Sequence, residues 1–165
     1  MNAAKQTALI ISLVPLAVIP FNLSAQGTHV GGAQTTTDKQ VVAVGWVTLS
    51  SSEFTIPDGQ IWRCAATGSA DAINPGTGLN KYRFTLSIDT FLPPYGGPCE
   101  RTVEFNVNAG VRNPSRLQVS STCKFSNVKA GHHRINWSAH QISGPAVQMI
   151  VPDNSHTVVC AEIGP

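Results

Sequence analysis

The chain has 165 residues, of which 42% are hydrophobic and only 12% charged, so it is long enough for one domain with its own apolar core. Eleven Lys and Arg residues nearly balance nine Asp and Glu residues, and the basic residues are not clustered in sequence. This distribution argues against nucleic acid or anionic lipid as a partner.

The first residues have the layout of a secretory signal peptide. Lys5 gives a positive start, residues 7–21 form an apolar run, and small residues end the segment at Ala25. The alternative is a membrane anchor, but the run is shorter than the roughly 20 residues that span a bilayer, and Pro15 and Pro20 interrupt it. We therefore expect residues 1–25 to be cleaved and the protein to be secreted, extracellular or periplasmic, with no membrane span afterwards.

The mature chain begins with a weakly patterned segment. Residues 26–39 are rich in Gly and Thr without an apolar repeat, which predicts a flexible leader or an irregular first strand. We place the folded domain at residues 40–165. Residues 40–49 form a β-branched run that predicts a buried strand, and Pro57-Asp58-Gly59 predicts a turn after the next segment.

Four further stretches alternate between apolar and polar residues, which is the two-residue period of a half-buried strand. They are residues 60–70, 81–89, 101–109 and 116–128. The alternation is clearest in the second stretch, where the side chains predicted to face inward are Tyr82, Phe84, Leu86 and Ile88. The two loops between these stretches, Asp71 to Asn80 and Phe91 to Cys99, are rich in proline and glycine.

The C-terminal part, Lys129 to Glu162, predicts a three-stranded meander. Its first strand has Ile135, Trp137, Ala139 and Gln141 on one face, and turn residues follow at 143–145 and again at 152–154. Such a meander cannot bury its apolar face alone, so the rest of the chain must supply a second sheet.

About eight strands and no helical repeat predict an all-β fold, an antiparallel β-sandwich of jelly-roll-like type. The pattern V-x-A-G-H-H-x-I-x-W, within Val128 to Val159, resembles the final strands of the jelly rolls of the tumour-necrosis-factor and complement globular-head families and of related bacterial or phage surface proteins. The resemblance implies a jelly roll. Those families usually form trimers and often follow a collagen-like stalk, whereas this chain has no G-x-y repeat.

All four cysteines lie in the mature part, an even number in an exported chain, which predicts two disulfides. Cys64 and Cys160 lie in the middle of predicted strands, whereas Cys99 ends a proline-rich loop that needs an anchor. We therefore expect Cys64 to pair with Cys160, and Cys99 with Cys123.

The histidines do not predict a metal site, and we expect no cofactor. His132 and His140 share a strand face, but eight residues at about 3.3 Å each place them about 26 Å apart. His133 and His156 could meet across strands, although no carboxylate pattern accompanies them. Solvated or hydrogen-bonded histidines are the simpler interpretation.

No catalytic constellation is evident. A G-x-S-x-G turn and a free thiol are both absent from the sequence pattern, and carboxylates such as Glu100 with Glu104, or Asp71 with Asp89, have no reason to converge as a glycosidase pair.

Aromatic and modification motifs have equally plain interpretations. Trp46, Trp62 and Trp137 share their strand faces with apolar neighbours, which favours a core over a sugar-stacking platform. Asn136 begins a glycosylation sequon but lies in the middle of a predicted strand.

The sequence thus predicts a secreted, non-enzymatic β-sandwich that acts by binding an unknown protein or glycan, or as a surface or matrix component. The alternative is a secreted hydrolase or carbohydrate-binding module whose site is built from the loops Asp71 to Asn80 and Phe91 to Cys99.

Overall fold

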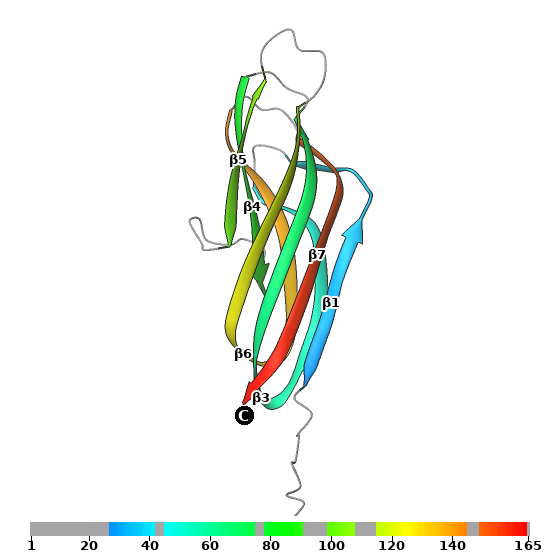
Figure 1. Cartoon of the computed structure of the whole chain (residues 1–165), viewed down its shortest axis with the longest axis vertical. Helices are drawn as coiled ribbons and strands as arrows, with labels where there is room; N and C mark the ends of the chain where they lie inside the picture. The colour runs from blue at the N-terminus through cyan, green and yellow to red at the C-terminus, as the bar shows by residue number, and fades with distance from the viewer. Residues whose placement is uncertain are drawn as a thin grey trace, which may run out of the picture.

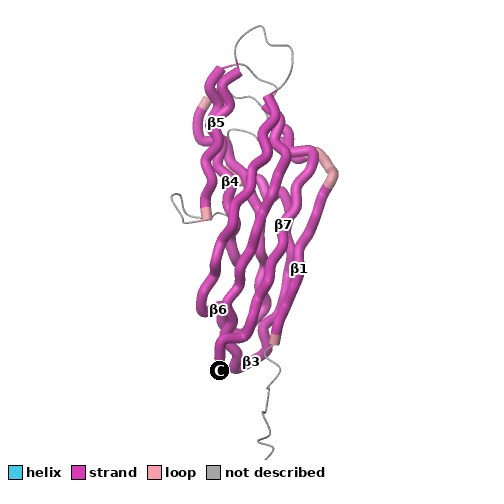
Figure 2. Tube along the Cα trace, viewed as in Figure 1, coloured by secondary structure: helices cyan, strands magenta, loops and turns pink. Residues whose placement is uncertain are grey.

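The computed structural model describes residues 27–41, 45–74, 78–90, 99–107, 115–144 and 149–164. These residues contain strands and no helix, which confirms the all-β prediction (Figure 2). The predicted signal peptide, residues 1–25, lies outside them. The strands are β1 (Thr28–Thr35), β2 (Lys39–Val41), β3 (Val47–Asn74), β4 (Gly78–Ile88), β5 (Glu100–Val107), β6 (Ser115–Ser143) and β7 (Met149–Gly164).

Hydrogen bonding joins the strands antiparallel in the order β1-β7-β3-β6-β4-β5, with β2 also paired to β7. The long strands β3 and β6 run side by side for almost their whole length (Figure 1). Residues 47–56 of β3 pair with residues 131–139 of β6, and residues 61–74 pair with residues 115–129. Each long strand therefore contributes one half to each of two sheets.

One sheet contains β1, β7 and the later half of β3 beside the early half of β6. The other contains the early half of β3, the later half of β6, β4 and β5. With the halves counted separately, this makes two four-stranded antiparallel sheets in a jelly-roll-like order. The predicted β-sandwich is confirmed, although its strands are fewer and longer than expected.

The first correction concerns Pro57-Asp58-Gly59, which is not a turn between strands. These residues lie within β3, where the register against β6 shifts between Ile56 and Ile61 and Gly59 has a φ of 79°. Opposite them, Gly131 of β6 has a φ of 138°. The register shift and the two residues of positive φ bend both strands together, and β3 pairs with β6 on both sides of the bend, so the chain passes from one sheet to the other.

The second correction concerns Pro152-Asp153-Asn154, which does not break β7. Along one edge of β7, β2 pairs with Met149–Val151 and β1 pairs from Asn154 onward. Pro152 lies between the two pairings, where its missing amide hydrogen costs no ladder bond on that side. The predicted three-stranded meander is therefore two strands, β6 and β7.

The N-terminal segment also differs in detail from the expectation. Residues 28–35, within the segment predicted as a flexible leader, form the regular strand β1 against β7. The single strand predicted at residues 40–49 corresponds to the end of β2 and the start of β3, with Gly45 at a φ of 84° between them.

The core lies between the two sheets and is built from the alternations read in the sequence. Tyr82, Phe84 and Leu86 of β4 are buried, as predicted. The indole of Trp137 is fully buried and packs against Gly68, where an added Cβ atom would lie 2.5 Å from the indole Cδ2 atom. The indole nitrogen donates a hydrogen bond to the Ser69 carbonyl oxygen at 3.2 Å, which ties β6 to β3 across the sandwich.

Both predicted disulfides are present. Cys64 and Cys160 are directly opposite one another on β3 and β7, with a Cα–Cα distance of 4.0 Å, and both are fully buried. Cys99 joins Cys123 of β6 with a Cα–Cα distance of 5.0 Å and so fixes the start of β5 to the opposite sheet. The pairing agrees with the expectation from the positions of the cysteines.

Candidate functional site

The outer surface of the sheet β1-β7-β3-β6 carries rows of small polar side chains. Cross-strand register aligns Thr157, Thr67 and Thr122 in one row, because Thr67 is opposite both of the others. Residues two positions apart along a strand share a face, so the same register aligns Ser155, Ser69 and Ser120 in the next row. We call this surface the hydroxyl face; it consists of Gln34, Thr67, Ser69, Asp71, Gln118, Ser120, Thr122, Asp153, Ser155 and Thr157.

The hydroxyls of this face bond one another along the rows. The Ser69 and Ser155 Oγ atoms are 2.9 Å apart, and the Thr67 and Thr122 Oγ1 atoms are 3.5 Å apart. Each hydroxyl offers one donor and two acceptor positions, so these contacts leave capacity for further hydrogen bonds. The face is polar, and Thr67 and Ser69 at its centre are exposed to solvent.

One end of the hydroxyl face is hollowed and acidic. A depression of about 380 Å³ is lined there by Ser69, Asp71, Gln118 and Asp153, among others. Asp71 and Asp153 are directly opposite one another on β3 and β7. The Arg116 guanidinium lies 3.8 Å from the Asp71 carboxylate and partly balances the charge.

The other end of the same sheet surface has a different character. A second, open depression of about 740 Å³ is lined by the charged residues Arg63, Lys124 and Glu162 and by apolar Val159 and Ile163, among others. The two depressions therefore differ: this one combines charged and apolar side chains, whereas the first is polar with two carboxylates.

His156 forms a polar link between the sheets that the sequence did not indicate. Its Nδ1 atom is 2.8 Å from the Ser50 Oγ atom and its Nε2 atom is 2.7 Å from the Ser52 Oγ atom. Burial lowers the pKa of the His156 imidazole, which favours the neutral ring; that ring donates to one serine and accepts from the other.

A hydrogen bond between a histidine and a serine hydroxyl is also found where the histidine activates the serine as a nucleophile. Here the exposed fractions are 3% for His156 and 8% for Ser50, and both ring nitrogens are bonded to serines rather than one to a carboxylate. His156 and Ser50 are thus almost completely buried, whereas Ser52 is half-buried. The two hydrogen bonds connect β7 of one sheet to the early half of β3 in the other sheet.

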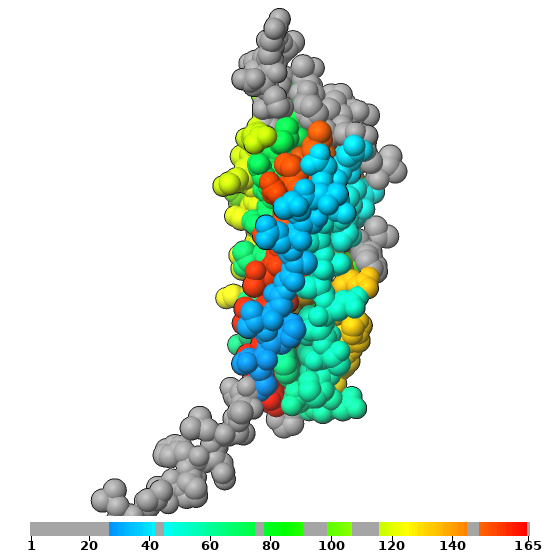
Figure 3. All heavy atoms as spheres, turned by 90° about the vertical axis from the view of Figure 1, so that its right-hand side faces the viewer, coloured from blue at the N-terminus to red at the C-terminus, as the bar shows by residue number. Residues whose placement is uncertain are grey.

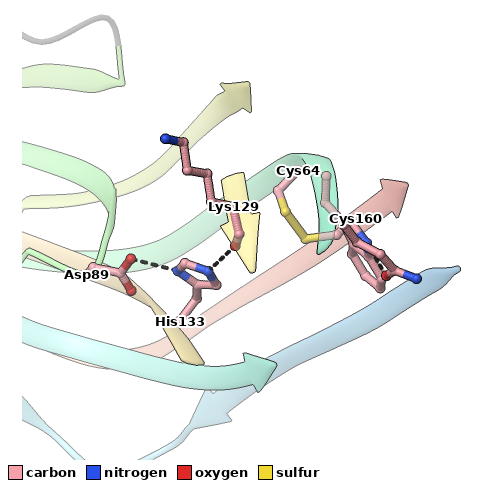
Figure 4. The surroundings of a disulfide bond; sticks show 7 residues. Cys64, Asp89, Lys129, His133 and Cys160 are labelled. Atoms are coloured by element: carbon pink, nitrogen blue, oxygen red, sulfur yellow. Dashed lines mark hydrogen bonds and ion pairs between the residues drawn. A yellow bond between two sulfur atoms is a disulfide. The ribbon is translucent and has the colours of Figure 1, made fainter. Parts of the chain in front are cut away.

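The other histidines have separate partners. His133 lies between the Asp89 carboxylate, 2.7 Å from its Nδ1 atom, and the Lys129 carbonyl oxygen, 2.8 Å from its Nε2 atom (Figure 4). His132 lies 3.4 Å from Glu53, and His140 contacts the ring of Trp46. Among the residues with described positions, no group of three or more His, Cys, Asp or Glu side chains is placed to hold a metal ion.

Two of the three tryptophans and the sequon lie where the sequence analysis placed them. Trp62 and Trp137 are buried in the core, whereas Trp46, which was also expected in the core, is half-buried beside His140. Asn136 has no exposed surface, and its side-chain amide donates to the Thr90 carbonyl oxygen at 3.4 Å. The sequon is therefore inaccessible in the folded domain.

The carboxylate pairs considered from the sequence do not form a site. Glu100 pairs with Arg83 and Glu104 pairs with Lys81, and the two glutamates are four residues apart on β5, about 13 Å along a strand. Asp71 lies opposite Asp153 instead of near Asp89.

The two loops of the alternative prediction lie largely outside the described residues. Asp71–Asn74 closes β3 and Gly78–Asn80 opens β4, whereas residues 75–77 and 91–98 are not described. The loop-built site therefore stays a prediction. In the parts of the chain that the structure describes, no helix is long and apolar enough to span a membrane.

Comparisons with known proteins give weak structural matches only. No family model and no curated protein matches the chain. Among solved structures, dimeric latent PorU from Porphyromonas gingivalis matches with a TM-score of 0.49 and 8% identity over 84% of this chain, which spans 13% of the length of PorU.

Two further matches have lower scores. TmCBM61 in complex with beta-1,4-galactotriose matches with a TM-score of 0.26 and 15% identity, over 81% of this chain and 88% of that one. A protein of infectious bursal disease virus, Gt strain, matches with a TM-score of 0.24 and 12% identity, over 96% of this chain and 47% of that one. At this level the likeness defines no function.

Proposed function

We propose that this is an exported, non-enzymatic binding protein and that the hydroxyl face is its ligand-binding surface. The observation that carries the proposal is the ordered array of hydroxyl, amide and carboxylate groups across four strands, with a depression at its acidic end. Side chains on paired strands are held in place by the sheet, so the array is ordered before a ligand arrives.

The chemistry of the face fits a glycan better than an apolar protein surface. Sugar hydroxyls both donate and accept hydrogen bonds, as do the Ser, Thr and Gln side chains of the face, while Asp71 and Asp153 add acceptors. Large apolar anchors, which dominate protein interfaces, do not line this depression. A glycan chain lying across the strands is therefore the ligand class we propose.

Binding of the purified protein to a glycan array, followed by calorimetry, tests this proposal. Ser69→Ala removes a central hydroxyl and leaves the Cβ atom in place, and should weaken binding by about 0.5–1.5 kcal/mol, or roughly 2- to 13-fold. Glu104→Gln, on β5 of the other sheet and ion-paired with Lys81, is the matched control and should leave affinity unchanged. Absence of binding by the folded protein to every glycan would reject the ligand class.

A hydrolase is the second candidate, because Asp71 and Asp153 are opposed within the depression. Opposite residues of an antiparallel pair have Cβ atoms about 4.5–5.5 Å apart, and glycosidase carboxylates lie roughly 5–10 Å apart. An assay for reducing-sugar release distinguishes the two functions. Release that disappears in Asp153→Asn supports the hydrolase, whereas binding without release supports the binding protein.

Export is part of the same proposal. Two disulfides suit an oxidising compartment such as the extracellular space or the periplasm. N-terminal sequencing of the protein recovered outside the cytoplasm should begin at Gln26. A chain that still carries residues 1–25 and remains in the membrane fraction would support the anchor instead.

A further inference from the structure

β1 ends the strand order on one side, and no other strand in the described residues pairs with its outer edge. The Glu162 amide donates to the Gly27 carbonyl oxygen, so the ladder bonds to β7 are made by Gly27 and then by every second residue of β1. The residues between them, Thr28, Val30, Gly32 and Gln34, direct their N–H and C=O groups away from β7.

This edge has none of the devices that usually prevent edge-to-edge pairing. Natural edge strands are protected by charged residues, prolines or bulges. β1 has eight residues in unbroken register with β7 and contains no Lys, Arg, Asp, Glu or Pro. At the opposite end of the strand order, β5 carries Glu100, Arg101 and Glu104.

β1 also lies open on the surface. Figure 3 shows it along the front of the molecule, with its side chains uncovered for most of its length. Val30 is 71% exposed, the highest value among the large hydrophobic residues described as exposed. An exposed, uncharged, regular edge strand is a template for another strand.

The strand is complementary to a second copy of itself. When two β1 strands run antiparallel about a twofold axis through Gly31, Val30 lies opposite Gly32, and Thr28 lies opposite Gln34. Gly32 has no side chain, so no side-chain atom of that residue opposes Val30 of the other copy.

We propose that β1 pairs antiparallel with β1 of a second copy, so that the two sheets β1-β7-β3-β6 become one continuous sheet in a twofold dimer. The near balance of acidic and basic residues gives little overall repulsion between copies. The dimer would also place two hydroxyl faces on one surface, but the pairing itself does not depend on what that face binds.

Light scattering of the purified protein during size-exclusion chromatography, over a range of concentrations, tests the proposal. The protein should form a dimer that dissociates on dilution. Val30→Lys introduces a charge beside the twofold axis at an exposed position and should raise the dissociation constant at least about tenfold. Val30→Thr, which keeps the β-branched shape without a charge, is the control and should dimerise within about threefold of the wild type.

Amide hydrogen exchange locates the interface independently of any variant. Protection of Val30, Gly32 and Gln34 should increase with protein concentration, whereas Gly31 and Ala33, bonded to β7, should be protected at every concentration. A monomer at every concentration tested would overturn the proposal. The proposal would also be overturned if the wild type dimerises, Val30→Lys dimerises equally well, and the amides of β1 gain no protection as the protein concentration rises. Either result would leave glycan binding by the monomer to be judged by its own assay.

Discussion

Removal of the disulfide between Cys64 and Cys160 should cost this domain more stability than removal of the other one. The two cysteines are 96 positions apart in sequence, whereas Cys99 and Cys123 are 24 apart. The loop-entropy relation gives about 4.7 kcal/mol for the longer loop and about 3.5 kcal/mol for the shorter one at 25 °C. Since small domains are stable by roughly 5–15 kcal/mol in total, either loss is a large share.

Guanidinium unfolding of the double variants C64A/C160A and C99A/C123A measures both losses against the wild type. The free energy of unfolding of C64A/C160A should be about 1.2 kcal/mol lower than that of C99A/C123A. The slope of this free energy against denaturant concentration should be similar in the two variants. Both Cys64 and Cys160 are fully buried, so their truncation also leaves a small cavity that acts in the same direction. An equal loss in the two variants, or a greater loss in C99A/C123A, would refute the argument from loop length.

Two further predictions concern contacts between the sheets. Gly68→Ala places a Cβ atom 2.5 Å from the buried Trp137 indole and should lower the free energy of unfolding by about 1–3 kcal/mol. Thr67→Ala, on the exposed face of the same strand, is the control and should lower it less. A thermal unfolding experiment in which Thr67→Ala is the less stable variant would contradict this packing argument. Because burial lowers the folded-state pKa of His156, the unfolded chain binds more protons as the pH falls through the unfolded value of about 6.5. The free energy of unfolding is therefore retained above that pH and falls below it, by at most about 1.4 kcal/mol per pH unit. The decrease should be smaller in His156→Gln, which has no imidazole to protonate. Urea midpoints that change equally in both proteins between pH 7.5 and 5.5 would oppose this reasoning.

The sequence alone predicted the all-β fold, the inward faces of several strands and the cysteine pairing, but not where the strands begin and end. A two-residue alternation is a local property, so the inward direction of Tyr82, Phe84 and Leu86 followed from neighbouring residues. The pairing was inferred from the positions of the cysteines relative to those strands. The alternation depends on short-range order, which each segment carries within itself.

Only the tertiary structure decided what happens at the two proline-containing breaks. Pro57-Asp58-Gly59 has the chemistry of a turn, but the pairing of β6 with β3 on both sides of it makes it a bulge in one long strand. Whether a local break ends a strand depends on whether the partner strand continues past it. That partner lies some seventy residues away in sequence, beyond the reach of a local pattern.

The hydroxyl face was likewise hidden from the sequence. Thr67, Thr122 and Thr157 are unremarkable polar residues on the outer sides of three strands, and only the register of β3 with β6 and β7 brings them into one row. The same holds for His156, which meets Ser50 and Ser52 only because the two sheets pack against each other. Register and packing between distant segments are set by the whole fold, which is why the candidate binding surface became visible only in three dimensions.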